Sequence, residues 1–357
     1  MTIREVRCSR LTADLHTPFV TALRSTRTLE TLVVEVVDDD GLRGFGEAPQ
    51  VWRVTGESLE SAQACVEGPL SAAVCGRSAD DLNDLVLDVR QAVVGNWSAK
   101  AAVDVALHDL VARCRGISLP VFLGSCRHQV DTDVTISAGP VEELTTGALK
   151  RVAEGFRVLK LKVGTSADAD IERVSSVREA VGADVIIRVD ANQGWTVREA
   201  VAVIRALEDA GAGLEFVEQP VSAYDVEGLA TVTAAVDTPV MADESVFDLR
   251  DLTTVIQRRA ADLVNIKLAK CGGLSAARSM LDLARAHDVG VIVGSMMEGP
   301  IGVGAAASLV AAFGTSCISD LDAAWWLASS PVVGGLSYDA GTLRLPEGPG
   351  LGILGLA

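Results

Sequence analysis

The strongest constraint on the fold is a repeat of short apolar segments and helical segments between about residue 130 and residue 320. Eight apolar segments have the length of strands, and segments of helical periodicity separate them. The strands are predicted at residues 133–137, 158–163, 185–190, 214–218, 240–243, 263–267, 291–294 and 317–320. Alternating strands and helices form parallel sheets, and eight units in about 190 residues favour a closed (β/α)8 barrel over an open sheet.

The residues outside this repeat have a different character. Residues 1–125 contain β-branched runs, an Asp-Gly pair at residues 40–41 that is typical of a hairpin turn, and a helical pattern at residues 98–115. We therefore expect a small α+β domain there and the barrel over residues 126–324. Residues 325–357 are rich in Gly and Pro, and we expect them to return to the N-terminal domain.

Charge and composition exclude several classes of protein. The net charge of −17 argues against a nucleic-acid partner, which would require Lys and Arg. Residues 1–7 carry charges where a signal peptide would be apolar, and the weakly polar run at residues 301–313 is too short to span a bilayer. The seven Cys form no C-x-x-C pair, which is typical of a reduced protein. We expect a cytoplasmic homo-oligomer without membrane or nucleic-acid partners.

Ionisable residues occupy the ends of five successive predicted strands. They are Lys160 and Lys162, Asp190, Glu218, Asp243 and Lys267. Each strand end is one strand–helix unit from the next, and active sites of (β/α)8 barrels lie at the C-terminal ends of the strands. Because side chains alternate along a strand, the lysines face away from the apolar Leu159 and Leu161. The charged side chains should therefore meet at one mouth of the barrel.

The three acidic residues and the lysines suggest a specific chemistry. Carboxylates on three neighbouring strands suit one Mg²⁺ ion, because close like charges repel unless a cation compensates them. Lys162 precedes these acids in strand order and Lys267 follows them, so the two amines should bracket a bound substrate. One could remove a proton from a carbon while the other returns one to the opposite face. Nearby positive charge should lower the pKa of such a lysine. A layer of salt bridges is the alternative, but it would not explain the regular placement.

The tripeptides at these strand ends resemble those of the enolase superfamily, muconate-lactonizing subgroup. They are Lys-Leu-Lys, Asp-Ala-Asn, Glu-Gln-Pro, Asp-Glu-Ser and Asn-Ile-Lys, at residues 160–162, 190–192, 218–220, 243–245 and 265–267. The resemblance implies a modified (β/α)8 TIM barrel beneath an α+β capping domain whose loop closes on the substrate. It also implies Mg²⁺ ligands, an acid/base pair and an electrostatic helper. These are, in that order, Asp190, Glu218 and Asp243; Lys162 and Lys267; and Lys160.

Within this subgroup the chain is most similar to dipeptide epimerases, in particular those of the L-Ala-D/L-Glu type. Such enzymes invert the Cα of the C-terminal residue through an enediolate. The resemblance implies that Asp320 and Asp322 bind the ammonium group of the dipeptide and that Arg24 meets the acidic side chain. Glu298 would lie near the substrate, and Thr135 would line the pocket.

Other functions remain open on the sequence. N-acylamino acid racemases, o-succinylbenzoate synthases and cycloisomerases share the site, but their substrates carry no free ammonium for the Asp-x-Asp pair. A non-catalytic binding barrel would not need two bases, and a glycosidase would use two carboxylates without flanking lysines. Arg27 and Gly299 depart from the pattern of the Ala-Glu epimerases and leave the exact dipeptide open.

Overall fold

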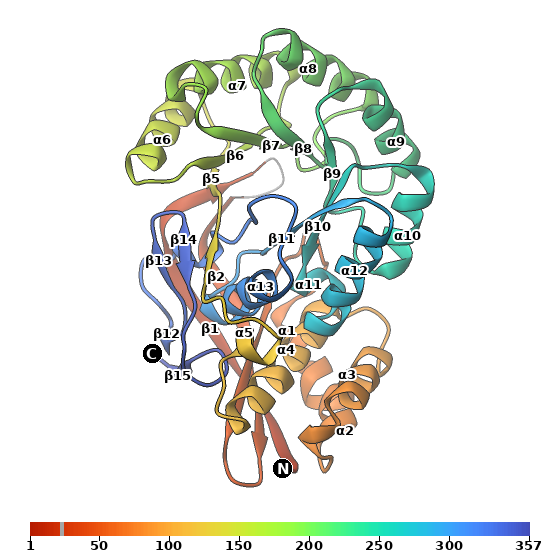
Figure 1. Ribbon diagram of the computed structural model, residues 1–357, viewed down its shortest axis with the longest axis vertical. Coiled ribbons are helices and arrows are strands. Elements are labelled where there is room, and N and C mark those ends of the chain that lie inside the picture. Colours follow the sequence, from red (N-terminus) through yellow and green to blue (C-terminus); the bar gives the residue numbers. More distant parts are fainter. Residues whose placement is uncertain (22–24) are drawn as a thin grey trace.

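The computed structural model describes residues 1–21 and 25–357. Its centre is a parallel sheet of seven strands in the order β11-β10-β9-β8-β7-β6-β5 (Figure 1). The strands are β5 (Val134–Ile136), β6 (Val158–Lys162), β7 (Ile186–Asp190), β8 (Leu214–Glu218), β9 (Val240–Ala242), β10 (Leu263–Lys267) and β11 (Gly290–Gly294). A helical connection follows each strand, so the predicted α/β barrel architecture is confirmed.

The eighth predicted strand is much shorter than expected. The segment predicted at residues 317–320 contributes only isolated bridges, from Ser319 to Thr132 and from Asp320 to Gly294. These bridges connect the end of β11 with the residue stretch before β5 and close the ring. Within this segment, the carbonyl of Ile318 accepts a hydrogen bond from the buried Arg188 Nη1 at 2.8 Å.

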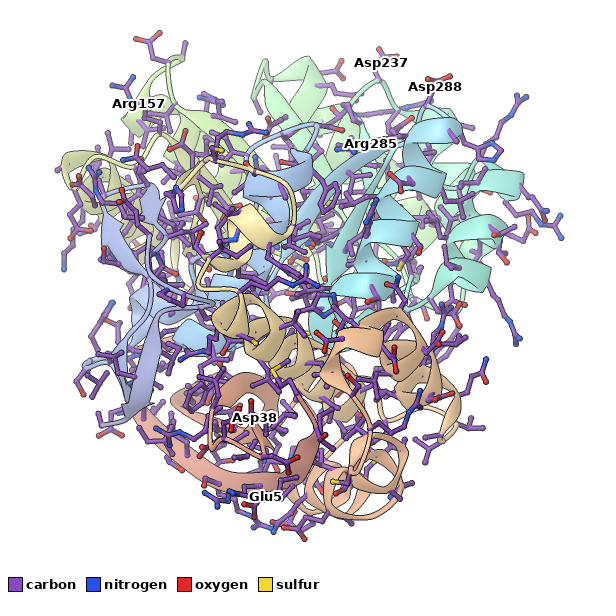
Figure 2. The ribbon with its side chains drawn as sticks, turned by 60° about the horizontal axis from the view of Figure 1, so that its bottom comes forward. Glu5, Asp38, Arg157, Asp237, Arg285 and Asp288 are labelled. Atoms are coloured by element: carbon purple, nitrogen blue, oxygen red, sulfur yellow. The ribbon has the colours of Figure 1, made fainter. Side chains whose placement is uncertain are left out.

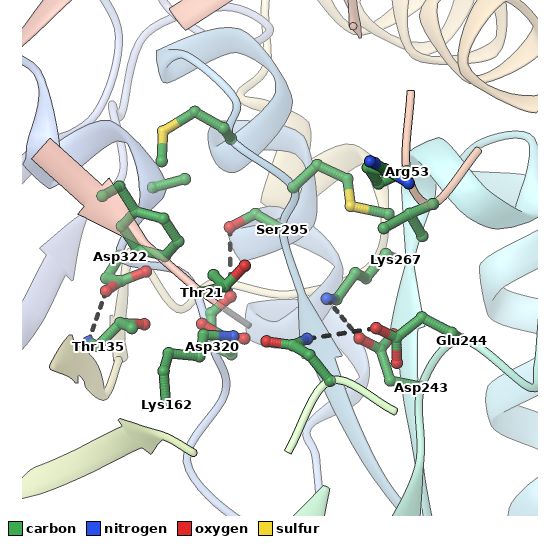
Figure 3. A pocket seen from close by; sticks show the side chains of 16 residues that line it. Thr21, Arg53, Thr135, Lys162, Asp243, Glu244, Lys267, Ser295, Asp320 and Asp322 are labelled. Atoms are coloured by element: carbon green, nitrogen blue, oxygen red, sulfur yellow. Dashed lines mark hydrogen bonds and ion pairs between the residues drawn. The ribbon is translucent and has the colours of Figure 1, made fainter. Parts of the chain in front are cut away.

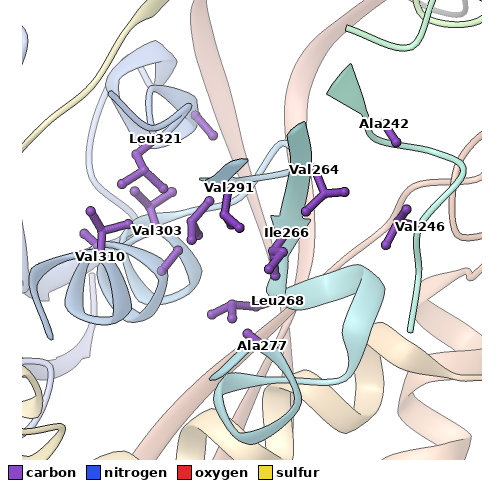
Figure 4. Packing of buried hydrophobic residues seen from close by; sticks show 14 of the residues in the cluster. Ala242, Val246, Val264, Ile266, Leu268, Ala277, Val291, Val303, Val310 and Leu321 are labelled. Atoms are coloured by element: carbon purple, nitrogen blue, oxygen red, sulfur yellow. The ribbon is translucent and has the colours of Figure 1, made fainter. Parts of the chain in front are cut away.

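The barrel helices form an arc around the strands (Figure 1). They are α6 (Val141–Ala153), α7 (Ala167–Val181), α8 (Val197–Asp209), α9 (Val226–Ala235), α10 (Leu249–Arg258), α11 (Leu268–Cys271), α12 (Leu274–Ala286) and α13 (Pro300–Phe313). The apolar side chains of each strand pack outward against them. Val264 and Ile266 of β10 lie in one buried cluster with Ala277 of α12 (Figure 4). The alternate residues of the same strands face the interior of the barrel.

The N-terminal domain is an antiparallel sheet of β1 (Ile3–Val20), β2 (Ser25–Asp38) and β3 (Arg43–Pro49), packed against helices. The helices are α1 (Leu59–Cys65), α2 (Ser71–Val74), α3 (Leu82–Gln91), α4 (Trp97–Cys114) and α5 (Leu119–Phe122), with a π-helical turn at Val66–Leu70. Figure 1 shows this domain beside one side of the barrel. The predicted hairpin between β2 and β3 is present.

The C-terminal residues connect the two parts of the molecule. β12 (Val332–Gly334) pairs with β15 (Ile353–Leu356), while β13 (Ser337–Asp339) and β14 (Thr342–Arg344) form a sheet with β4 (Gln129–Asp131). Asp109 of α4 is fully buried and accepts hydrogen bonds from the backbone N–H groups of Phe45 and Leu351. One carboxylate therefore holds β3 and the C-terminal segment against the same helix.

Charged residues at the two ends of the barrel strands differ in their surroundings. Arg157, Asp237 and Asp288 come shortly before β6, β9 and β11, and all three are exposed (Figure 2). By contrast, Lys162 and Asp190, at the C-terminal ends of β6 and β7, are buried. Charge is therefore solvated at one end of the barrel and concentrated inside the other. Among the described residues, no helix has the length and apolar character needed to cross a membrane.

The contact between β3 and α4 leaves no room for a side chain at Gly46. A Cβ atom there would lie 1.8 Å from the carbonyl oxygen of Ala102. We expect Gly46→Ala to reduce the free energy of unfolding by about 1–3 kcal/mol or more, because backbone must move to relieve the overlap. Denaturant unfolding measures the change. Gly68→Ala is the matched control, since its Cβ would meet no atom within 4 Å. Equal stability of the two variants would contradict this account of the domain's packing.

Candidate active site

A cavity of about 630 Å³ lies at the C-terminal ends of the barrel strands, between the barrel and the N-terminal domain (Figure 3). Both parts of the molecule contribute to its wall. The polar lining residues from the barrel are Thr135, Lys162, Asn192, Asp243, Glu244, Lys267, Ser295, Asp320 and Asp322. Phe19, Thr21, Arg53 and Val54 complete it from the N-terminal domain.

The two lysines predicted as bases lie on opposite sides of the barrel mouth. Lys162 ends β6 and Lys267 ends β10, and three strands separate them in the sheet. In the other direction around the ring, β11, the segment at residues 319–320 and β5 separate them. Lys162 Nζ lies 2.6 Å from Asp190 Oδ2, and Lys267 Nζ lies 2.8 Å from Asp243 Oδ2. A molecule in the cavity therefore has an amine on each side.

Lys160 lies below the cavity and connects several acids. It is almost completely buried, and its Nζ lies 2.6 Å from Glu218 Oε2, 2.7 Å from Asp320 Oδ2 and 3.1 Å from Asp190 Oδ2. Burial alone would lower the pKa of Lys160, but Asp320 and the other acids raise it well above its ordinary value. The Lys160 ammonium is therefore held as a positive charge among these carboxylates.

The carboxylates differ in their ionisation. Burial and the Asp190 charge raise the pKa of Glu218 to about 6, and burial and the Asp243 charge raise the pKa of Glu244 to about 8. Asp190 is equally buried, but Lys162 and Lys160 lower its pKa to about 2. The expected lowering of a lysine pKa is not found at Lys267. Its burial acts in that direction, but the carboxylate of Asp243 outweighs it and raises the pKa of Lys267.

The predicted ligand set fits a divalent cation by its donor chemistry. Asp190, Glu218 and Asp243 are fully buried acids at the ends of β7, β8 and just beyond β9. Beside them, the buried oxygens Asn192 Oδ1 and Glu244 Oε2 have no hydrogen-bond donor in the described part of the chain. Buried acceptors without donors are rare unless they face an ion or water, and hard oxygen atoms are the ligands that Mg²⁺ prefers.

A second group of acids brings its oxygens within 4.8 Å of one another: Asp133, Asp320 and Asp322. Two of these acids are paired with donors of the protein, as are the acids of the predicted set. Asp133 pairs with Arg188 at 2.9 Å, and Asp320 pairs with Lys160 at 2.7 Å. Asp133 does not line the cavity, and neither do Asp190 and Glu218 of the predicted set. We keep the predicted set as the candidate metal ligands because the buried oxygens of Asn192 and Glu244 extend its donor set, and we treat the second group as another candidate cation site.

Asp320 and Asp322 form the acidic end of the cavity. Asp322 Oδ2 accepts hydrogen bonds from Thr135 N at 2.7 Å and Trp326 Nε1 at 2.9 Å, which orient its carboxylate. Burial and the neighbouring Asp320 raise the pKa of Asp322. An ammonium group between these two carboxylates would relieve their repulsion. Thr135 lines the cavity as expected, and its backbone holds one of the acids.

One other predicted substrate contact, Glu298, is not at the cavity wall. Glu298 is buried behind it, where its Oε1 accepts a hydrogen bond from Met296 N at 2.9 Å. Burial and the nearby Glu47 raise the pKa of Glu298 to about 8. In this position, Glu298 shapes the loop that presents Met296 and Met297 to the cavity. Arg24 lies outside the described residues.

Sequence reasoning did not single out several residues at the site. Lys270 is buried, and its Nζ lies 2.5 Å from Asp243 Oδ1, so that two lysines share this acid. Its position one helical turn after Lys267 could have identified it from the sequence. Asp133 lies two residues before Thr135 and therefore on the same face of the strand, so it could also have been identified. Arg53 had no such signal, because its loop belongs to a different domain and no strand pattern places it.

An α+β domain over a barrel mouth that carries two opposed lysines and three acids is the architecture of an enolase-type enzyme. Family models agree: residues 3–124 match "Mandelate racemase / muconate lactonizing enzyme, N-terminal domain", and residues 143–354 match "Enolase C-terminal domain-like". The chain belongs to the mandelate racemase/muconate lactonizing enzyme family of the enolase superfamily.

Individual relatives cover the whole chain. An L-Ala-D/L-Glu epimerase from Bacillus subtilis is 43% identical over 100% of this chain and 98% of its own. A substrate-liganded structure of the L-Ala-D/L-Glu epimerase from B. subtilis has a TM-score of 0.97 and 42% identity, with both chains fully covered. A dipeptide epimerase from Enterococcus faecalis, in complex with Mg and L-Leu-L-Tyr, has a TM-score of 0.95 and 37% identity over 99% of each chain.

Proposed function

We propose that this protein is a Mg²⁺-dependent dipeptide epimerase that inverts the Cα of the C-terminal residue, with L-Ala-D/L-Glu as the leading substrate. The observation that carries the proposal is the placement of Lys162 and Lys267 on opposite sides of one cavity, above three buried acids. The relatives named above act on such dipeptides or were solved with Mg and a dipeptide, which supports both the ion and the substrate class.

Each part of the substrate has a matching part of the cavity. Asp190, Glu218 and Asp243 would hold one Mg²⁺, which supplies positive charge for the substrate carboxylate and its developing enediolate. Lys162 and Lys267 face the two sides of the Cα; one accepts its proton while the other donates a proton to the opposite face. Lys160 adds a fixed positive charge below the same carboxylates. Asp320 and Asp322 bind the ammonium group at the other end of the cavity.

The negative charge of Asp320 and Asp322 favours a free dipeptide over an N-acyl amino acid. An N-acyl substrate has no ammonium, so it would leave Asp320 and Asp322 facing each other with only Lys160 to neutralise them. A dipeptide supplies the missing charge. This is the structural reason to rank N-acylamino acid racemase activity below dipeptide epimerisation.

Isotope exchange in heavy water tests the proposal. With Mg²⁺ in D₂O, we expect the purified protein to incorporate deuterium at the Glu Cα of L-Ala-L-Glu and of L-Ala-D-Glu, as measured by mass spectrometry. N-acetylation of L-Ala-L-Glu should reduce kcat/KM by about tenfold to a hundredfold, since one charge-assisted contact is lost. No exchange with any member of a dipeptide panel would reject the proposal. Faster turnover of N-acyl substrates would instead favour a racemase.

A further inference from the structure

Arg53 is a lining residue of the cavity that the proposed mechanism does not use. It belongs to the loop between β3 and α1, next to the exposed Trp52, and its own side chain is also exposed. Besides the main cavity, it lines two neighbouring ones, one with Trp52 and Met297 and one with Glu244 and Ser245. Arg53 therefore lies at the junction of three neighbouring cavities.

The charge of Arg53 is not neutralised within the structure. Among the described residues, three basic side chains line the main cavity, of which Lys162 and Lys267 are already paired with Asp190 and Asp243. Across residues 1–21 and 25–357, Arg53 makes neither an ion pair nor a hydrogen bond. Figure 3 shows it beyond Lys267, on the side of the cavity away from Asp322 and Thr135. An unpaired guanidinium presents a planar fork that suits a carboxylate.

The directions of the four substituents on the substrate Cα indicate which of them points toward Arg53. This step rests on the proposed function. The peptide nitrogen leads toward Asp320 and Asp322, and the carboxylate faces the metal ligands on the barrel floor. The proton must face Lys162 or Lys267, which occupy the two sides. The side chain of the C-terminal residue is left with the direction away from the floor and toward the N-terminal domain, where Arg53 lies (Figure 3).

We propose that Arg53 binds the side-chain carboxylate of the substrate's C-terminal residue and thereby contributes, beside the Arg24 implied by the family resemblance, to the selection of acidic dipeptides. A positive charge at this position also has a role at longer range. The chain carries a net charge of −17, which repels an anionic dipeptide, and a cation at the mouth offsets that repulsion locally. Arg53 is thus a specificity-determining residue and takes no part in proton transfer.

The test compares two substrates that differ only in charge. For L-Ala-L-Glu and its amide analogue L-Ala-L-Gln, we expect Arg53→Gln to reduce the ratio of the two kcat/KM values by about tenfold to a hundredfold, the range for one hydrogen bond to a charged group. Arg53→Lys keeps the charge and should retain a large part of the ratio. Arg90→Gln removes the same charge from an exposed position on α3 and is the matched control; its ratio should equal that of the wild type.

The outcomes separate this inference from the proposed function. If the wild-type protein exchanges no dipeptide in D₂O, the proposed function itself is wrong. If the wild type is active and prefers L-Ala-L-Glu, but Arg53→Gln has the same preference, then another cation binds the carboxylate and the inference is overturned. Turnover of L-Ala-L-Gln by the variant shows that it is folded, so loss of the preference cannot be attributed to unfolding.

Discussion

Replacing Lys162 or Lys267 with Met should strongly reduce epimerisation of the dipeptide and leave exchange at only one of its two epimers. Each lysine faces one side of the Cα, so the remaining amine can still remove and return a proton on its own side. We expect the rate of epimerisation to fall by about 10²–10⁴-fold, the contribution of a positioned acid or base. Chiral chromatography measures the epimerisation, and NMR in D₂O follows the loss of the Cα proton signal for each epimer.

The two variants should be mirror images of each other in this assay. If Lys162→Met exchanges only one epimer, Lys267→Met should exchange only the other. Lys150→Met is the matched control, since Lys150 is exposed on α6 and distant from the cavity in the fold. Exchange of both epimers by either variant would mean that one lysine serves both faces, which would contradict the two-base arrangement.

Removing one of the three acids should have a comparable effect through the metal. Glu218 is fully buried, lies between the candidate ligands of β7 and β9, and contacts Lys160 and Asn265. Glu218→Gln preserves its shape but removes one negative charge from the cation site. We expect Mg²⁺ to bind at least about 10-fold more weakly and kcat to fall by about 10³-fold, because the developing negative charge on the substrate is less well stabilised.

Calorimetric titration with Mg²⁺ measures the first effect without relying on turnover. A chelator should remove the activity of the wild type, and Mg²⁺ should restore it. Glu227→Gln is the matched control, since Glu227 lies on α9 in an exposed ion pair with Arg258. Unchanged Mg²⁺ affinity in Glu218→Gln would place the ion elsewhere; the group of Asp133, Asp320 and Asp322 would then be the first position to test.

The barrel and its charged strand ends could be predicted from the sequence because they depend on local periodicity. A strand that alternates Leu159, Lys160, Leu161 and Lys162 can bury its apolar face only against helices, which directs the lysines inward. The order of strands along the chain then determined which residues face each other around the ring. The amino-acid sequence alone therefore assigns Lys162 and Lys267 to opposite sides of the barrel mouth.

Features that depend on contacts between segments distant in the sequence could not be predicted from local periodicity. The strand expected at residues 317–320 is reduced to isolated bridges at Ser319 and Asp320, and the buried Arg188 from β7 donates a hydrogen bond to the carbonyl of Ile318 in the same segment. Glu298 faces the packed interior beside Glu47 of the N-terminal domain instead of the cavity. The raised pKa of Lys267 follows from how close Asp243 lies, which no spacing along the chain reveals.

The sequence by itself determined the parallel α/β barrel and the identity of its charged strand ends, and its strand-end tripeptides carry the resemblance to the family. The barrel and its strand ends depend on patterns that repeat within a few residues, and each repeat has a single way to bury its apolar face. Only the tertiary structure decided which of the charged strand ends line the cavity. It also showed that Arg53, from the N-terminal domain, is a lining residue. The reason is physical: burial and ion pairing depend on distances between side chains from separate elements, and these distances exist only once the domains have packed together.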